Sequence, residues 1–213
     1  MNKRHFFAAA LGAAFTRRTA RAAEAPFITE PGAIAAQVIG RINIGADAIT
    51  EVALYFAFID GLGGDLFNGE SSEKTAHFTL RTDRLRTLVT LNGDAAHLTF
   101  QPEGESGLYH VYYDPSASSR SFTSPGTFSQ GTKIAAFKSR RTQTTLVPGS
   151  HGLVTGTADV VESSVMNYRD VAYNIADLFN SITFTFHTKA FSITAAGIPA
   201  VSIPFAGHLI KVS

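Results

Sequence analysis

Residues 181–187, with the sequence SITFTFH, decide the fold of this chain. Apolar and polar residues alternate strictly along this stretch, so in an extended chain Ile182, Phe184 and Phe186 lie on one face and the threonines on the other. Apolar residues recur with this period of two in a strand that is buried on one face and exposed to solvent on the other. In a helix that is buried on one side they recur with a period of about 3.6. We therefore predict a strand of an antiparallel sheet at residues 181–188.

Similar alternation recurs along most of the chain. One face of residues 76–81 is apolar, and Asn92-Gly93 separates two further alternating segments. Because Asn-Gly supplies the positive φ angles of a type I′ turn, we predict a hairpin of residues 85–91 and 95–101. Further strands are predicted at residues 36–44, 50–59, 108–113, 132–139, 142–147, 152–162 and 200–212.

About ten short strands thus follow one another, with turn residues and no clear helix between them. This pattern predicts an all-β antiparallel fold, either a barrel or a sandwich. We favour a closed or nearly closed barrel, because closure removes exposed edge strands. The one ambiguous segment is 170–180, where apolar residues fit a helical stripe as well as a strand, and we expect a short helix or an irregular crossing there.

The first 22 residues have the composition of an export signal. A basic segment, KRHFF at residues 3–7, opens a short apolar stretch, and residues 20–22 supply the A-x-A site that a signal peptidase cleaves. The KRHFF segment, the weakly apolar alanine-rich stretch and the late arginines resemble a twin-arginine export signal, with Lys in place of the first Arg. The resemblance implies export of a folded chain to the periplasm or the extracellular space. The general secretory route is the alternative.

Removal of this signal leaves residues 23–213, which are enough for a single domain with one core. Five of the 18 basic residues and none of the 17 acidic ones lie in residues 1–22, so 13 basic and 17 acidic residues remain, a formal charge of −4. A mildly acidic domain lacks the clustered Lys and Arg that bind phosphates, and we expect no nucleic-acid partner. No later apolar run reaches the ~18 residues of a membrane-spanning helix, so we expect no integral membrane segment.

The chain has no cysteine. This excludes thiolate zinc sites, cysteine-ligated iron–sulfur clusters and cysteine nucleophiles, and it fits folding in a reducing cytoplasm before export. Patterns such as Gly-x-Ser-x-Gly and His-Glu-x-x-His are also absent, and we expect no cofactor. In architecture the predicted barrel is similar to lipocalin-like and allene-oxide-cyclase-like barrels. The chain carries no motif of either family, so no function is carried over.

Two connections between predicted strands stand out. Residues 60–70 are rich in glycine, and Asp60 and Asp65 offer the oxygen ligands that calcium prefers, without the spacing of an EF-hand loop. A plain glycine-rich connection is the simpler interpretation. Residues 112–131 form a long serine-rich connection, and connections of this length are often lids or binding loops. We expect an ordered cover over a barrel end or a sheet edge, with the candidate ligand-binding residues Tyr113, Phe122 and Phe128.

Histidines far apart in the sequence are candidate metal ligands. His77, His97 and His187 fall on the polar faces of predicted strands. If these faces line a barrel interior, the three imidazoles can meet and hold a metal ion. Exposure to solvent without a special role is the simpler interpretation.

A candidate catalytic group lies on and after the strand 108–113. His110 lies between Leu108 and Tyr112 on one strand face, and Arg120 follows in the long connection. His110, Tyr112 and Arg120 are therefore candidate catalytic residues of a pocket. A partly buried histidine bonded to a neighbour is the alternative interpretation.

Two functions remain open. The first is an exported, soluble, non-catalytic β-barrel that binds a small apolar ligand or a surface partner. Its support is the lack of catalytic motifs and thiols in a β-rich chain with 17 Phe and 6 Tyr residues. The alternative is an exported barrel enzyme, such as a cyclase, isomerase or hydrolase, with a His/Tyr/Arg pocket.

Overall fold

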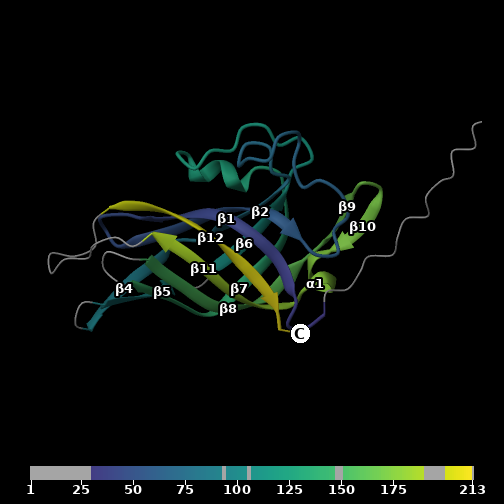
Figure 1. Ribbon diagram of the computed structural model, residues 1–213. Helices are drawn as coiled ribbons and strands as arrows, with labels where there is room; N and C mark the ends of the chain where they lie inside the picture. The colour runs from purple at the N-terminus through teal and green to yellow at the C-terminus, as the bar shows by residue number, and fades with distance from the viewer. Residues whose placement is uncertain (1–29, 93–94, 105–106, 147–150, 190–199, 213) are drawn as a thin grey trace, which may run out of the picture.

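The computed structural model describes residues 30–92, 95–104, 107–146, 151–189 and 200–212, which form a closed antiparallel β-barrel of eight strands (Figure 1). The barrel favoured from the sequence is therefore confirmed over the sandwich. The export signal expected at residues 1–22 and the turn residues Gly93 and Asp94 lie outside the described residues.

The wall of the barrel follows the order β1-β12-β11-β8-β7-β5-β4-β2, and pairing of β1 with β2 closes the ring. Two further strands, β3 and β6, join β2 to β7 along the other part of the same wall. The wall strands are β1 (Ile34–Ile44), β2 (Ile49–Ile59), β3 (Phe78–Thr82), β4 (Leu85–Asn92), β5 (Ala95–Pro102), β6 (Leu108–Tyr113), β7 (Thr132–Leu146), β8 (His151–Ser163), β11 (Ser181–Lys189) and β12 (Val201–Lys211).

Two positions in the ring are each shared by two short strands. β2 pairs with β4 near its start and with β3 further along, so β3 and β4 together act as one strand that is broken at Asp83. In the same way, β7 pairs with β6 over its first half and with β5 near its end. At the break, Asp83 Oδ2 accepts the backbone N–H of Leu108 at 3.0 Å. The carboxylate thus satisfies a donor at the point where the strand pattern is interrupted.

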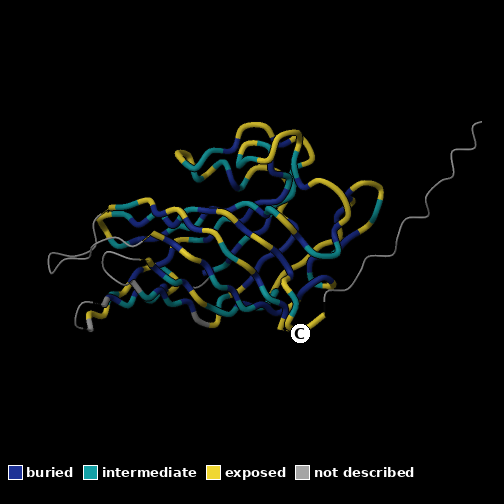
Figure 2. Tube along the Cα trace, in the orientation of Figure 1, coloured by how far each residue is buried: buried dark blue, intermediate teal, exposed yellow. Residues whose placement is uncertain are grey.

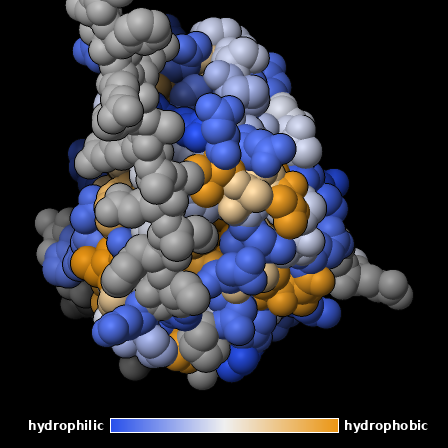
Figure 3. All heavy atoms as spheres, turned by 90° about the vertical axis from the view of Figure 1, so that its right-hand side faces the viewer, coloured by the Kyte–Doolittle hydropathy of each residue, from blue (hydrophilic) through white to orange (hydrophobic). Residues whose placement is uncertain are grey.

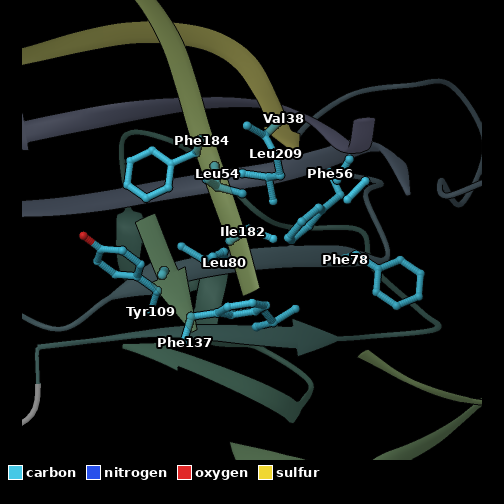
Figure 4. Close-up of a cluster of buried hydrophobic side chains, with 14 of the residues drawn as sticks. Val38, Leu54, Phe56, Phe78, Leu80, Tyr109, Phe137, Ile182, Phe184 and Leu209 are labelled. Carbon is cyan, nitrogen blue, oxygen red and sulfur yellow. The ribbon is translucent and has the colours of Figure 1, made fainter. Parts of the chain in front are cut away.

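Strand β11 places its apolar face in the barrel, as the alternation predicts. Ile182, Phe184 and Phe186 are 4%, 4% and 7% exposed. Phe186 stacks on Phe184 and on Phe205 of β12, with ring centroids 5.0 and 4.8 Å apart. Buried and exposed positions alternate along the wall (Figure 2), and apolar side chains from several strands meet in its centre (Figure 4). Full burial of each large apolar side chain stabilises the fold by about 1.5–3 kcal/mol.

Most predicted strands coincide with observed strands to within two residues, including the hairpin of β4 and β5. The separate strands predicted at residues 132–139 and 142–147 are wrong, because the two segments form the single strand β7. The basic residues between them mark a register shift against β8, between Ser139 and Arg141. A bulge of this kind interrupts the local alternation without ending the strand.

A hairpin that the sequence did not indicate overlaps the start of the ambiguous segment. It consists of β9 (Val165–Tyr168) and β10 (Val171–Asn174), and the short helix α1 (Ile175–Leu178) follows. Its turn residues Arg169 and Asp170 have φ angles of 52° and 65°, a conformation for which glycine or asparagine is the usual signal. The side chain of Asn174 accepts the backbone N–H of Ala176 at 3.0 Å and caps α1. The expected short helix is thus present.

The segments 60–77 and 114–131 leave the wall and pack against its outer side beside β1, β2 and β3 (Figure 1). The 3₁₀ helix η1 (Pro125–Ser129) lies in the second segment, and Thr79 Oγ1 donates to the carbonyl of Phe128 at 2.7 Å. The connection 114–131, which we call the cover, is thus ordered. It packs on the outer face of the wall and not over the barrel end or sheet edge expected from the sequence. At the adjacent barrel end, near β9 and β10, apolar side chains lie in small groups among hydrophilic ones (Figure 3).

Candidate functional site

The barrel wall has a gap where β7 changes partner. β7 pairs with β6 up to Lys138 and with β5 from Gln143 onward, so the residues between them have no ladder partner on that side. A cleft of about 270 Å³ opens at this gap. We name it the lateral cleft; its wall includes Thr99 and Gln101 of β5, Tyr109 of β6, and Ser139, Arg140 and Thr142 of β7.

Local sequence explains why the wall opens here. Pro102 ends β5 and has no backbone N–H with which to continue a ladder. Gly107 precedes β6 with a φ of 52°, and a Cβ at this position would lie 2.3 Å from Cγ of Pro102. Glycine therefore permits a close backbone approach that any other residue would prevent. The two residues flank the connection between β5 and β6, opposite the part of β7 that has no ladder partner on this side.

A small internal cavity lies directly behind the lateral cleft. Its volume is about 50 Å³, and apolar side chains from strands all round the ring line it. The lateral cleft and the internal cavity share four lining residues, Leu85, Phe100, Tyr109 and Thr142. Only side chains therefore separate the cleft from the barrel interior. In Figure 4, Tyr109 lies near Phe184 at one side of the apolar cluster, and its hydroxyl points away from that cluster.

A chain of hydroxyl groups lines the boundary between the cleft and the cavity. Tyr109 Oη lies 2.9 Å from Thr142 Oγ1, and Ser139 Oγ lies 2.8 Å from the same Thr142 atom. Burial raises the pKa of Tyr109, although the hydrogen bonds from Thr142 and Ser139 oppose this change. The phenol is therefore protonated at neutral pH and can serve as a hydrogen-bond donor inside an otherwise apolar wall.

The charge at the mouth of the cleft is compensated. Arg140 Nη2 donates to Asp159 Oδ1 at 2.7 Å, and Arg140 Nε donates to the second carboxylate oxygen. These hydrogen bonds lower the pKa of the Asp159 carboxyl. Because this pair is bidentate, the mouth offers little free charge to a ligand.

The three candidate catalytic residues do not converge on one pocket. His110 and Tyr112 lie on the outer face of β6 with ring centroids 6.4 Å apart, and His110 Nε2 lies 3.0 Å from Asp83 Oδ1. Arg120 is fully buried beneath the cover, where Nη1 donates to the carbonyl of Ala76 at 2.5 Å. None of the three lines the lateral cleft or the internal cavity.

Arg120 fastens the cover to the wall. Its Nη2 lies 3.4 Å from Asp114 Oδ2 and 3.4 Å from the carbonyl of Gln130. Burial lowers the pKa of the guanidinium, whereas the charge of Asp114 raises it. Asp114 and Gln130 lie at the two ends of the segment 114–131, and Ala76 lies just before β3. Arg120 therefore fixes both ends of that segment next to the start of β3.

The candidate ligand-binding aromatic residues have different environments. Tyr113 stacks on Phe78, with ring centroids 5.0 Å apart, and belongs to an aromatic cluster at the barrel end. Phe128 is fully buried and supports Phe122, with ring centroids 4.8 Å apart. Phe122 lines an open hollow between the cover and the wall.

The candidate metal ligands are not brought together. His77 Nδ1 lies 2.9 Å from the carbonyl of Asp114, His97 Nδ1 lies 3.3 Å from Thr145 Oγ1, and His187 is exposed. Asp60 and Asp65 lie in the connection after β2. Within the described ranges, no group of three or more His, Asp or Glu side chains is arranged to hold a metal ion. Polar side chains on the outer face of a closed barrel diverge, which is why His97 of β5 and His187 of β11 do not meet and why the simpler interpretation of the histidines fits better.

Nothing among known protein families, curated proteins and solved structures matches this chain. Its function must therefore be inferred from the geometry itself. In the described part of the chain, no helix has the length and apolar character needed to cross a bilayer.

Proposed function

We propose that this protein is an exported barrel that binds a small apolar molecule carrying one uncharged polar group, through the lateral cleft. The observation that carries this proposal is the set of four side chains shared by the cleft and the internal cavity. A molecule in the cleft contacts the interior of the barrel through this boundary alone. Ligand sites commonly combine an apolar lining with a few convergent polar groups, and the cleft has both.

The lining indicates the chemistry of the ligand. The hydroxyls of Tyr109, Thr142 and Ser139 can bond an alcohol, ether or carbonyl group. A charged head group would find the charge of Arg140 already matched by Asp159. The apolar remainder of the ligand packs against Leu85 and Phe100.

The volumes of the internal cavity and the lateral cleft indicate where the ligand lies. A cavity of about 150 Å³ is needed to hold benzene, and the internal cavity has about 50 Å³. The ligand therefore occupies the lateral cleft of about 270 Å³ and enters the interior only as far as rotation of Tyr109 permits. Because the candidate catalytic residues lie elsewhere, binding is better supported than catalysis.

Delivery outside the cytoplasm is part of the proposal, and its support is the composition of residues 1–22. N-terminal sequencing of protein recovered from the exporting host should show that the mature chain begins at Ala23. A mature chain that retains Met1 contradicts export by cleavage. A Lys3/Arg4 double variant should be exported less if the twin-arginine route is used.

Binding is tested with the neutral apolar fluorophore N-phenyl-1-naphthylamine, whose emission rises in an apolar site. We expect saturable enhancement with the native protein and a loss of about tenfold or more in affinity for Gln101→Trp, which fills the mouth of the cleft. His187→Trp, at an exposed position on β11, is the matched control and should bind normally. Equal binding by the two variants would place the probe outside the cleft and refute the proposal.

A further inference from the structure

We propose a second site, independent of the lateral cleft, on the outer face of β1 and β12, where the protein binds a neutral oligosaccharide. An open groove of about 600 Å³ lies there, between the wall and the cover. Arg41 and Asn43 of β1 and Ser202 of β12 form its floor. Phe122 and Pro125 of the cover form its roof. In Figure 1 the backbone of the cover lies above β1 and β2.

The floor of the groove has unused hydrogen-bonding capacity. Arg41 has no carboxylate within ion-pair distance among the described residues, and its nearest polar contact, Ser202 Oγ, is 3.4 Å from Nη1. The strand partners of Arg41 are Ala53 and Pro204, which offer it no polar side-chain group. Asn43 Oδ1 accepts the Ser202 hydroxyl at 2.6 Å, while its buried Nδ2 has no partner among the described residues.

The roof supplies an apolar platform next to these polar groups. The guanidinium of Arg41 lies 5.9 Å from the ring centroid of Phe122. Phe128 and Tyr55 support the same ring, with centroids 4.8 and 6.2 Å away. A rigidly held aromatic ring beside unsatisfied polar groups suits a ligand with both C–H surfaces and hydroxyls.

The polar groups of the groove are mixed in kind, and this selects the ligand class. Arg41 can only donate hydrogen bonds, Glu73 can only accept them when ionised, and the amide and hydroxyls do both. Alcohol groups, which donate and accept, match this mixture, whereas an anion would face Glu73 and a cation would face Arg41. A neutral, polyhydroxylated molecule therefore fits best.

A neighbouring hollow indicates that the ligand is extended. It has a volume of about 520 Å³ and is also lined by Asn43, together with Glu51, Asp47 and Arg84. Charges of both signs again face the hollow. The two polar hollows lie next to each other and both contact Asn43, an arrangement that suits several linked sugar units better than one.

Isothermal titration of the full mature protein with maltohexaose, cellohexaose and chitohexaose tests the proposal. We expect binding of at least one hexasaccharide, with affinity lowered about tenfold or more by Arg41→Met and by Asn43→Ala. Lys138→Met, which removes another exposed cation from an outer strand face, is the matched control and should bind normally. Phe122→Ala should also weaken binding, and Arg41→Met and Asn43→Ala keep the test valid if that variant loosens the cover.

Three results overturn the proposal: no binding of any hexasaccharide to the folded protein, equal binding by all variants, or displacement of the sugar by inorganic phosphate, which would mark an anion site. Gln101→Trp, which blocks the lateral cleft, should leave sugar binding unchanged. Failure of this site and failure of the proposed function are therefore distinguishable.

Discussion

Gly107 lies against Pro102 so closely that a Cβ on the glycine would approach Cγ of the proline to 2.3 Å. The two residues flank the connection between β5 and β6, beside which β7 changes partner and the lateral cleft opens. Single substitutions test how much this close packing contributes to stability.

Gly107→Ala should destabilise the protein by about 1–3 kcal/mol, because the new methyl group overpacks the contact with Pro102. Urea denaturation followed by circular dichroism measures the change. Gly104→Ala is the control, since Gly104 also has a positive φ, 100°, but no atom within 4 Å of the added Cβ. A loss no greater than that of Gly104→Ala would show that the contact with Pro102 is unimportant.

Tyr109→Phe should cost about 1 kcal/mol at neutral pH, because one buried hydrogen bond is lost while Thr142 keeps its bond to Ser139. At alkaline pH, by contrast, the same substitution should reduce the loss of stability. Burial raises the pKa of Tyr109 in the folded state, so its contribution to stability is complete below the unfolded value of about 10 and is lost as the pH rises above it. When the pH is raised from neutral to above about 10, the free energy of unfolding should therefore fall less for the variant than for the native protein. Parallel loss in both proteins would argue against a buried phenol.

Phe184→Ala should enlarge the internal cavity and cost about 3–5 kcal/mol. If the fold persists, the variant should bind N-phenyl-1-naphthylamine more tightly, because the space behind Tyr109 grows. Thermal unfolding and fluorescence titration measure the two effects. Phe58→Ala, at a position that is 43% exposed, is the control and should change neither the thermal stability nor the probe affinity by much.

Arg120→Met should loosen the cover at a cost of about 2–4 kcal/mol, because a buried cation that bonds Ala76, Asp114 and Gln130 is removed. Limited proteolysis should then cut within residues 114–131 sooner than in the native protein. Lys138→Met is the comparison, since its charge is exposed. Equal resistance of the two variants to protease would contradict the role of Arg120.

The barrel could be predicted because its cause is local. In residues 181–187 the period of two assigns each side chain to one face, and Ile182, Phe184 and Phe186 are buried as predicted. The β4–β5 hairpin was also predictable, because its turn signal and both strands lie close together in the sequence.

The lateral cleft could not be predicted in the same way. It depends on where β7 exchanges one partner for another, and Tyr109 and Thr142, which bond across it, are 33 residues apart. The local signals were Pro102 and Gly107, which mark a turn without indicating that a wall opens beside it.

Arg120 was misjudged for a related reason. A cation in a serine-rich connection suggests contact with solvent or a ligand, but its partner Ala76 lies 44 residues earlier in the chain. Long-range contacts of this kind decide whether a charge is exposed or buried, and they leave no local pattern in the sequence.

The pairing of β1 with β12 has a consequence for synthesis of the protein. The two strands pair through residues such as Gln37 and His208, which are separated by most of the chain. Until β12 has left the ribosome, β1 and β11 each present an edge of unpaired backbone groups to other nascent chains. Contacts of such high sequence separation also make folding slow. The nascent barrel is therefore exposed to pairing with other chains at these two edges until its last strand has been made.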